Sequence, residues 1–238
     1  MREKRKSRFC LVGANIQNSL SPKIFNYWFE KHNLRATYEL KEIKPNVFEK
    51  EFLELLNIYY GLNVTSPYKK SCKKFLQHND LSSINAIKEK KGFNTDLKGF
   101  LKALKIIGLR NNFYNSKKVL VLGRGGTAHT LLQKESLNKK RFDVLIRDKK
   151  HKPIEARGVF YLKSPPREEY EFVINCTTKK KLLFDKIKTK HYLDLNYTLE
   201  ERGLFPKAML LHQAAESFFL WFGFRPAMTK QLRKIVGI

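Results

Sequence analysis

The chain has 238 residues, of which 42% are hydrophobic. This length suits one large domain or two compact ones, and the apolar content excludes a wholly disordered protein. No apolar run approaches the roughly 18 residues that span a bilayer, and the apolar stretch after the basic N-terminus is too short for a secretory signal. We therefore predict a cytoplasmic protein with no membrane partner.

The net charge of +26, from 48 basic and 22 acidic residues, raises the question of nucleic-acid binding. The basic residues are spread along the whole chain without a tail or patch. This argues against a nucleic-acid partner and favours a general attraction to anionic small ligands. The three cysteines lie far apart, and the sequence has no CxxC pair or His/Cys cluster. We expect neither a disulfide framework nor a metal site.

The first half of the chain alternates predicted strands with predicted helices. Ser21 precedes Pro22, an order typical of a helix N-terminus, and we expect Ser21 to cap that helix. Pro67 similarly suits the first turn of a helix that follows a strand. The residue pattern predicts strands over 9–13, 36–43 and 61–64, and helices over 21–32, 46–56 and 96–108.

A second α/β pattern begins near residue 115. Its first strand, 117–123, is a continuous apolar run typical of a buried parallel strand. Alternating strands and helices predict parallel sheets, and the restart predicts two of them. Further strands are predicted over 142–146, 158–163, 171–175 and 191–195, and helices over 127–137, 207–223 and 229–236.

A glycine-rich turn follows the first strand of this second half and opens a helix. It has the G-x-G-x-x-A form of the dinucleotide fingerprint in the required strand–turn–helix context. Gly123 allows the tight turn, and Gly125 lets the backbone approach a pyrophosphate. The predicted cofactor-binding residues of this turn are Gly123, Gly125, Gly126 and Thr127.

The next strand of this half ends at Arg147. An acidic residue at this point would bind the ribose hydroxyls of NAD, whereas a basic one suits the 2′-phosphate of NADP. Arg147 therefore favours NADP, and the neighbouring Asp148 keeps NAD as the alternative.

Four short segments of the first half carry more polar side chains than a core requires. Three of them lie where a predicted strand ends or a helix begins, and in parallel α/β sheets ligands bind at the carboxyl ends of strands. Hydroxyls, amides, one ammonium and one carboxylate converging there would suit a polyhydroxylated anionic ligand. The segments are 19–22, 63–69, 84–86 and 92–99.

These segments resemble the motifs of the shikimate dehydrogenase family. The family pattern contains Ser-x-Ser-Pro, Asn-Val-Thr-x-Pro-x-Lys and Gly-x-Asn-Thr-Asp, which are matched at 19–22, 63–69 and 92–96. Order and spacing hold from about Val12 to Gly223. The later matches are the glycine turn at 123–128, Asn175-Cys176-Thr177, Asp194 with Tyr197, and Met209-Leu210 with Gln213-Ala214.

The resemblance implies a role for each matched residue. Lys69 and Asp96 are similar to the family's catalytic pair. Oxidation of a hydroxyl releases a hydride and a proton, so we expect Lys69 to carry the proton and Asp96 to orient it. The implied substrate contacts are Ser19, Ser21 and Tyr197 for the shikimate carboxylate, and Thr65, Asn85 and Gln213 for the ring hydroxyls.

The resemblance also implies two α/β domains around a cleft. The substrate domain would be residues 1–111, completed by C-terminal helices over 206–238, and the Rossmann-like NADP domain would be 112–205. The implied function is NADP-dependent interconversion of shikimate and 3-dehydroshikimate in aromatic amino-acid biosynthesis, by a monomer or homodimer.

Two alternatives to this function stay open. One is a dehydrogenase of quinate or a related cyclohexane acid, and the other is a non-catalytic protein that keeps the shikimate pocket. The cofactor half departs from the family pattern, because Arg124 replaces a small residue and 178–181 replaces a Pro-x-Gly-Met stretch. That departure favours the non-catalytic alternative, whereas the intact Lys69 and Asp96 favour an enzyme.

Overall fold

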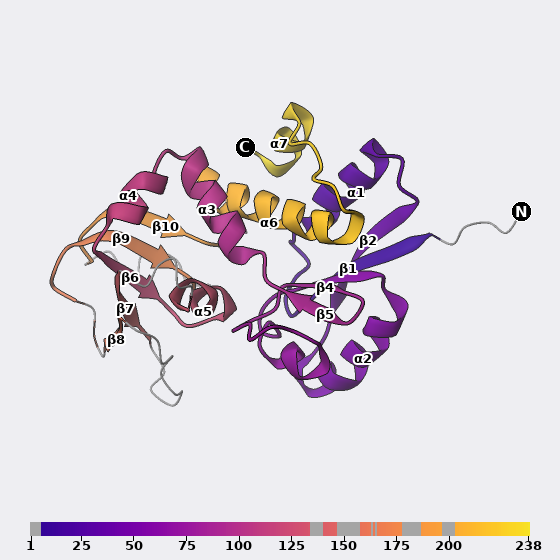
Figure 1. Cartoon of the computed structure of the whole chain (residues 1–238), viewed down its shortest axis with the longest axis horizontal. Helices are drawn as coiled ribbons and strands as arrows, with labels where there is room; N and C mark the ends of the chain where they lie inside the picture. The colour runs from indigo at the N-terminus through magenta and orange to yellow at the C-terminus, as the bar shows by residue number, and fades with distance from the viewer. Residues whose placement is uncertain are drawn as a thin grey trace, which may run out of the picture. The chain divides into compact units, whose positions relative to one another are not determined.

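The chain forms two compact units, unit 1 (Met1–Gly99 and Leu210–Ile238) and unit 2 (Phe100–Met209) (Figure 1). The computed structural model describes residues 6–133, 140–146, 158–162, 164, 166–177, 187–196 and 203–238. Each unit contains one five-stranded sheet with helices, so the predicted fold class of two α/β domains is confirmed. The limits of the units fall inside α3 (Asp96–Ile106) and α6 (Leu204–Phe222), because both helices run uninterrupted across them.

The sheet of unit 1 has the strand order β2-β1-β3-β4-β5. β1 pairs in parallel with both β2 and β3, whereas β3, β4 and β5 are antiparallel neighbours. The carboxyl ends of β1 and β3 therefore lie at the same edge of the sheet. The strands are β1 (Ser7–Gly13), β2 (Ala36–Glu42), β3 (Gly61–Val64), β4 (Ala86–Lys88) and β5 (Lys91–Phe93).

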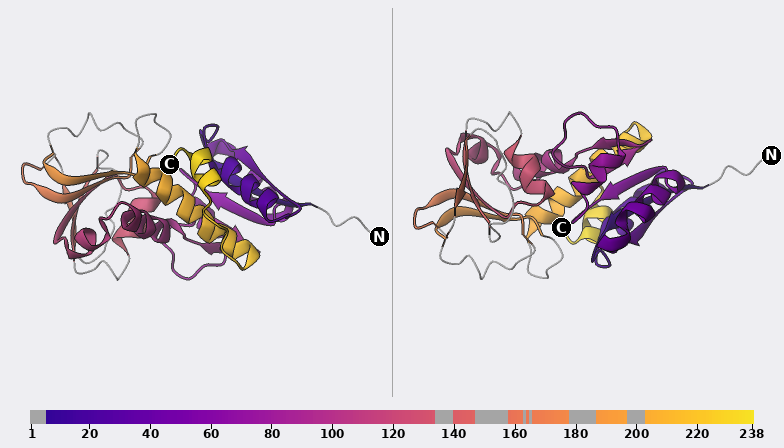
Figure 2. Two further views of the ribbon diagram at one scale, coloured as in Figure 1. Left: turned by 90° about the horizontal axis from the view of Figure 1, so that it is seen from above. Right: turned by 90° about the horizontal axis from the view of Figure 1, so that it is seen from below.

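Helices α1 (Ser21–Lys31) and α7 (Lys230–Val236) lie side by side in both views of Figure 2. The hydroxyl oxygens of Tyr27 and Thr229 are 2.7 Å apart. Thr229 also caps α7, since its hydroxyl accepts a hydrogen bond from the backbone N–H of Leu232. Residues Pro45–Val47 form a 3-10 turn, η1, which leads into helix α2 (Phe48–Ile58) of the same unit.

The end of α6 packs on the sheet of unit 1. The Trp221 ring lies 4.7 Å from that of Phe9 and 5.1 Å from that of Phe25, and its Nε1 donates to the carbonyl of Ile87 at 2.9 Å. A Cβ at Gly61 would overlap the Trp221 indole, so β3 needs glycine at its first residue. The aromatic C-terminal helix thus completes the core formed by the N-terminal strands.

The sheet of unit 2 is parallel throughout, in the order β10-β9-β6-β7-β8. The central strand β6 leads through the glycine turn into α5 (Gly126–Leu132), which is the Rossmann-like arrangement that the sequence predicted. The strands are β6 (Lys118–Leu122), β7 (Arg141–Leu145), β8 (Val159–Leu162), β9 (Tyr170–Asn175) and β10 (Thr189–Asp194), preceded by the short helix α4 (Arg110–Asn115).

The predicted helix beginning at Pro67 is wrong. Residues 66–70 form a turn, followed by a 3-10 helix, η2 (Ser71–Phe75). Tyr68 is buried, with its ring stacked on Phe48 at 4.0 Å and its backbone N–H bonded to the carbonyl of Thr65. The turn therefore places the Tyr68 ring in the core, where the local sequence had favoured a helix.

A buried carboxylate organises one end of the unit 2 sheet. The Asp143 side chain is fully buried and accepts hydrogen bonds from the Tyr170 hydroxyl at 2.6 Å and from Arg141 Nε at 2.9 Å. Lys118 Nζ lies 3.3 Å from the same carboxylate and also contacts Glu168. Burial alone raises the pKa of Asp143, but these partners together outweigh it and hold that pKa below its ordinary value.

The lowered pKa makes the stability of unit 2 depend on pH. Asp143 is protonated more readily in the unfolded chain, so its stabilisation is present above about pH 4 and is lost as the pH falls further. We expect Asp143→Asn to lower the free energy of unfolding by about 1.5–3 kcal/mol at pH 7, because charge-assisted hydrogen bonds are lost. The difference from the unmodified protein should narrow below about pH 4.

Urea unfolding followed by circular dichroism at pH 7 and at pH 3.5 measures both effects. Glu168→Gln is the matched control, because the Glu168 side chain is 54% exposed and its loss should cost under about 1 kcal/mol. A penalty for Asp143→Asn that is equal at the two pH values would contradict the role given to the charged carboxylate.

Candidate functional site

Lys69 and Asp96 form an ion pair in unit 1, with Lys69 Nζ 2.7 Å from Asp96 Oδ2. Lys69 lies in the turn after β3, and Asp96 is the first residue of α3. Their side chains are 12% and 1% exposed. A charge-assisted hydrogen bond at this depth is little weakened by solvent, so the ammonium group is held at one place beside the carboxylate.

Asn85 joins this pair to helix α6. Its Nδ2 lies 2.8 Å from Asp96 Oδ1, 3.0 Å from Thr95 Oγ1 and 3.3 Å from Gln213 Oε1. Its Oδ1 accepts from the backbone N–H of Thr95 at 2.8 Å. Four of the residues singled out in the sequence, Lys69, Asn85, Asp96 and Gln213, therefore belong to one hydrogen-bonded group.

The two predicted carboxylate-binding serines contact each other at the start of α1. The Ser19 hydroxyl lies 3.2 Å from the Ser21 hydroxyl, and it accepts from the Ser21 backbone N–H at 3.2 Å. The prediction that Ser21 caps α1 is wrong. Ser21 is the first residue of the helix, and Leu20 occupies the cap position without a side-chain hydrogen bond. The Ser19 hydroxyl instead binds the N–H at the helix start.

Thr65 stands at the end of β3, beside the end of β1. Its backbone N–H donates to the carbonyl of Val12 at 2.9 Å. A Cβ at Gly13 would lie 2.5 Å from Thr65 Cγ2, so only a glycine at position 13 leaves room for the Thr65 side chain. Thr65 and the two serines thus follow the neighbouring parallel strands β3 and β1 at one sheet edge.

Three supporting residues were not among the predicted site residues. Asn63 Nδ2 donates to the carbonyl of Asn85 and to the Ser217 hydroxyl, each at 2.9 Å, and Tyr38 donates to Asn63 Oδ1 at 2.8 Å. Ser217 in turn donates to the carbonyl of Gln213 at 3.2 Å. Only Asn63 has a signal in the sequence, as the first residue of Asn-Val-Thr-x-Pro-x-Lys.

The glycine turn of unit 2 has the backbone that its sequence predicts. Gly123 has a φ of 89°, and a Cβ there would lie 2.7 Å from Thr177 Cγ2. Gly125 is exposed, and Gly126 and Thr127 begin α5. This open glycine backbone fits the close approach of a pyrophosphate. Two predicted site residues, Arg147 and Tyr197, lie outside the described residues.

Arg124 projects from the same turn. Its Nη1 is buried, and among the residues that the structure describes it has no hydrogen-bond partner. A buried guanidinium nitrogen without a partner is costly, and an anion bound at the turn would supply one.

No group of three or more His, Cys, Asp or Glu side chains suitable for a metal ion occurs among the described residues. Across the same part of the chain, no helix is long and apolar enough to cross a membrane.

Two family models match the chain. Residues 11–88 match the shikimate dehydrogenase substrate binding domain, and residues 208–236 match the shikimate 5′-dehydrogenase C-terminal domain. The first match contains Lys69 and Asn85, and the second contains Gln213. Three of the four residues of the hydrogen-bonded group therefore lie in the matched segments, whereas Asp96 lies outside both.

Curated relatives agree with these matches. Shikimate dehydrogenase (NADP(+)) of Thermotoga maritima is 28% identical over 129 residues, which are 52% of this chain and 49% of that protein, so the match spans about half of that relative's length. The enzyme of the same name from Pelagibacter ubique is 27% identical over an alignment of length 271, which covers 98% of this chain and 100% of the relative.

A solved structure shows the same fold over nearly the whole chain. Shikimate 5-dehydrogenase from Thermus thermophilus, in complex with NADP(H) and shikimate, superimposes with a TM-score of 0.74 at 24% identity. The superposition covers 97% of this chain and 98% of that one. The substrate-domain motifs and the C-terminal segment of the chain are thus similar to those of shikimate dehydrogenases, and its two-unit fold is the fold of their solved structures.

Proposed function

We propose that this chain is an NADP-dependent shikimate dehydrogenase, which interconverts shikimate and 3-dehydroshikimate. The Lys69–Asp96 ion pair carries the proposal, because an ammonium group and a carboxylate lie beside the side-chain amides of Asn85 and Gln213 in a chain similar to shikimate dehydrogenases. Unit 1 binds the substrate and unit 2 binds the cofactor. A cytoplasmic location and a monomeric or homodimeric state belong to the same proposal.

The polar groups of unit 1 divide the substrate between them. The hydroxyls of Ser19 and Ser21 donate to the carboxylate, for which the sequence resemblance also names Tyr197, a residue outside the described part of the chain. Thr65, Asn85 and Gln213 bind the ring hydroxyls, for which amides and hydroxyls are suitable because they both donate and accept. A polyhydroxylated acid satisfies this set of groups better than an apolar ligand would.

Lys69 moves the proton of the reacting hydroxyl. In the reducing direction, its ammonium group donates a proton to the carbonyl oxygen of 3-dehydroshikimate as the carbon receives a hydride, and the oxygen becomes the hydroxyl of shikimate. In the oxidising direction, the neutral amine takes that proton back. Asp96 keeps Lys69 aimed at one place, and Asn85 holds the second oxygen of Asp96.

In unit 2, Gly123, Gly125, Gly126 and Thr127 would hold the cofactor pyrophosphate, and Arg147 would favour the 2′-phosphate of NADP. When bound, NADP supplies the hydride acceptor or donor of the reaction. The Arg124 guanidinium adds a positive charge beside the same phosphates, which is supported by its buried Nη1, an atom with no hydrogen-bond partner among the described residues.

The purified protein, given shikimate or quinate with NADP or NAD in turn, tests the proposal by absorbance of the reduced nicotinamide. We expect the fastest turnover with shikimate and NADP. Faster turnover with quinate would show that the preferred substrate is quinate or a related cyclohexane acid. Shikimate binding without turnover would favour a binding protein that has lost its redox activity.

Lys69→Arg should lower kcat about 10²–10⁴-fold in both directions. Arginine keeps the positive charge beside Asp96, so the protein stays folded, but it does not release a proton near neutral pH. Shikimate affinity, measured by calorimetry, should stay within about tenfold. Lys73→Ala, a lysine four residues further along the same segment, is the control and should keep full activity. Near-normal turnover of Lys69→Arg would remove Lys69 from the proton transfer.

Ser21→Ala should raise the Michaelis constant for shikimate about ten- to a hundredfold, because a hydrogen bond to a carboxylate is worth about 1.5–3 kcal/mol. Because Ser21 does not cap α1, the free energy of unfolding of the Ser21→Ala variant should differ from that of the unmodified protein by less than about 1 kcal/mol. Ser71→Ala removes a hydroxyl from the 3-10 helix η2 and serves as the control. An unchanged Michaelis constant for Ser21→Ala would contradict the carboxylate site.

Arg124→Ala should weaken NADP and NAD binding alike, by roughly tenfold, since the pyrophosphate is common to both. Arg147→Asp should weaken NADP more than NAD, because a carboxylate would then face the 2′-phosphate. Fluorescence titration with each reduced cofactor measures binding without turnover, with Arg110→Ala as the control. If Arg124→Ala binds both cofactors normally, its guanidinium does not serve the phosphates.

A further inference from the structure

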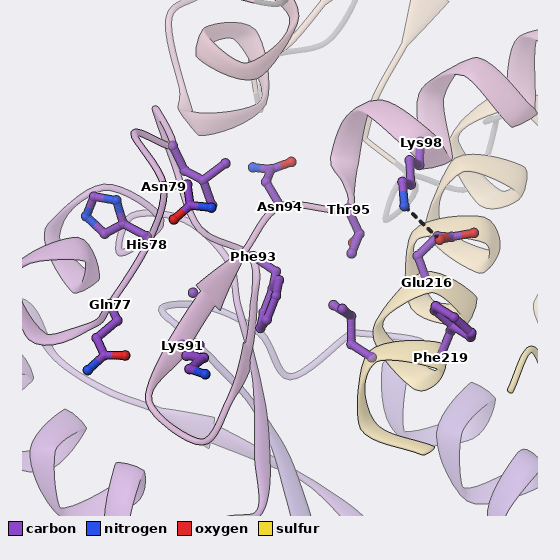
Figure 3. Close-up of a pocket in the computed structure, with 13 residues that line it drawn as sticks. Gln77, His78, Asn79, Lys91, Phe93, Asn94, Thr95, Lys98, Glu216 and Phe219 are labelled. Carbon is purple, nitrogen blue, oxygen red and sulfur yellow. Dashed lines mark hydrogen bonds and ion pairs between the residues drawn. The ribbon is translucent and has the colours of Figure 1, made fainter. Parts of the chain in front are cut away.

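Unit 1 contains a pocket of about 530 Å³ beside the start of α3 (Figure 3). One wall is formed by β5 and the segment 77–81, and the other by the first turn of α3 and by α6. Among the described residues, none of those assigned above to the substrate lines this pocket. Its volume lies in the range of small-molecule sites.

The walls of this pocket combine apolar rings with cations. The Phe93 ring lies between the two walls in Figure 3. Phe219 lines the pocket from α6, and one face of its ring is covered by the Arg225 guanidinium at 4.3 Å. Lys91 and Lys98 supply ammonium groups at opposite walls. The remaining apolar and amide lining comes from Leu81, Leu220, Gln77, Asn79 and Asn94. Flat apolar surface next to positive charge suits a flat apolar ligand that carries an anionic group.

The acidic group of the pocket is already neutralised. Glu216 is 3% exposed, and Arg225 binds both of its carboxylate oxygens at 3.0 Å. Lys98 lies 3.3 Å from Glu216 Oε2, and its side chain remains 65% exposed. Because one carboxylate faces two cations here, and Lys91 adds a third charge, the pocket keeps a net positive charge.

One lining residue also has an unsatisfied polar atom. Nδ1 of His78 is buried and has no hydrogen-bond partner within the described parts of the chain. Backbone bonds hold the neighbouring residue, since Gln77 N–H donates to the carbonyl of Lys90 and Gly92 N–H donates to that of Gln77. The wall that carries His78 is thus fixed to β5 while its polar groups are incompletely paired.

We propose that this pocket binds a second ligand, a carboxylate on a flat apolar ring, apart from the substrate. The ring would lie against Phe93 and the uncovered side of Phe219, and the carboxylate would be attracted by the positive charge that Lys91 and Lys98 supply from the two walls. The inference goes beyond the shikimate reaction and does not depend on it.

The pocket is connected to the candidate active site through Asn94. Asn94 lines the pocket, its Nδ2 donates to the carbonyl of Ser83 at 2.9 Å, and its Oδ1 accepts from the backbone N–H of Asp96 at 3.0 Å. Thr95, also in the lining, bonds Asn85. A ligand in the pocket therefore contacts the residues that position the carboxylate beside Lys69, so its binding is expected to alter turnover without displacing the substrate.

Calorimetry of the full chain with 2-naphthoate tests the proposal. We expect saturable binding of one molecule, weakened about fivefold by Lys91→Gln and about fivefold by Lys98→Gln. Arg225 still neutralises Glu216 in Lys98→Gln, so that variant should fold normally. Lys105→Gln, at an exposed lysine of the same helix outside the pocket, is the matched control and should bind as the unmodified protein does.

Three further probes separate the possible sources of binding. Neutral 2-naphthamide and inorganic phosphate should each bind at least tenfold more weakly than 2-naphthoate, because each lacks either the charge or the ring. Saturating shikimate should leave the naphthoate affinity unchanged. The proposal is overturned if naphthoate fails to bind, if the Lys91→Gln/Lys98→Gln double variant binds it normally, or if shikimate displaces it. These readouts need no turnover, so they stand even where the dehydrogenase assay fails.

Discussion

The candidate site of unit 1 depends on one buried carboxylate. Asp96 is almost completely shielded from water. A buried carboxylate is stable only when a positive group of the protein balances its charge and its oxygens accept hydrogen bonds. Lys69 meets one oxygen and Asn85 the other. Lys69 lies in the turn after β3 and Asn85 is the residue before β4, so the carboxylate links two separate parts of unit 1.

A second layer of polar contacts orients these partners. The carbonyl oxygen of Asn85 can only accept a hydrogen bond, so the Asn63 amide must turn its Nδ2 towards it. Asn63 Oδ1 then faces Tyr38, whose hydroxyl donates to it. The same amide reaches Ser217 on α6, one turn from Gln213. These hydrogen bonds connect β3, the residue before β4 and helix α6 around the candidate site.

The sequence predicted those features that depend on local pattern. The buried parallel strands of both sheets follow from continuous apolar runs, and the turn at Gly123 follows from a glycine that adopts a φ of 89°. The pairing of Lys69 with Asp96 came from the motif resemblance, since neither residue differs by itself from an ordinary surface lysine or a helix cap.

The features that escaped prediction depend on contacts between distant residues. β5 follows β4 through Glu89 and Lys90, both at positive φ, where a hairpin turn is normally signalled by Asn or Gly. Tyr38 and Ser217 form hydrogen bonds with Asn63, from which they are distant in sequence, and no local sequence pattern predicts these contacts. Tyr68 lies in a turn, where a helix was predicted, and stacks on Phe48, which is 20 residues away in the sequence.

The discontinuity of unit 1 has a consequence for synthesis on the ribosome. Its sheet is complete in sequence by Phe93, yet Trp221, which covers Phe9 and Phe25, emerges only after all of unit 2. At a synthesis rate of about 5–20 residues per second, the aromatic side chains of the nascent N-terminal half stay exposed for roughly ten seconds before Trp221 is made. Unit 2 is contiguous and can form meanwhile. We therefore expect the newly made N-terminal half to be the stage at which this chain most needs protection from aggregation.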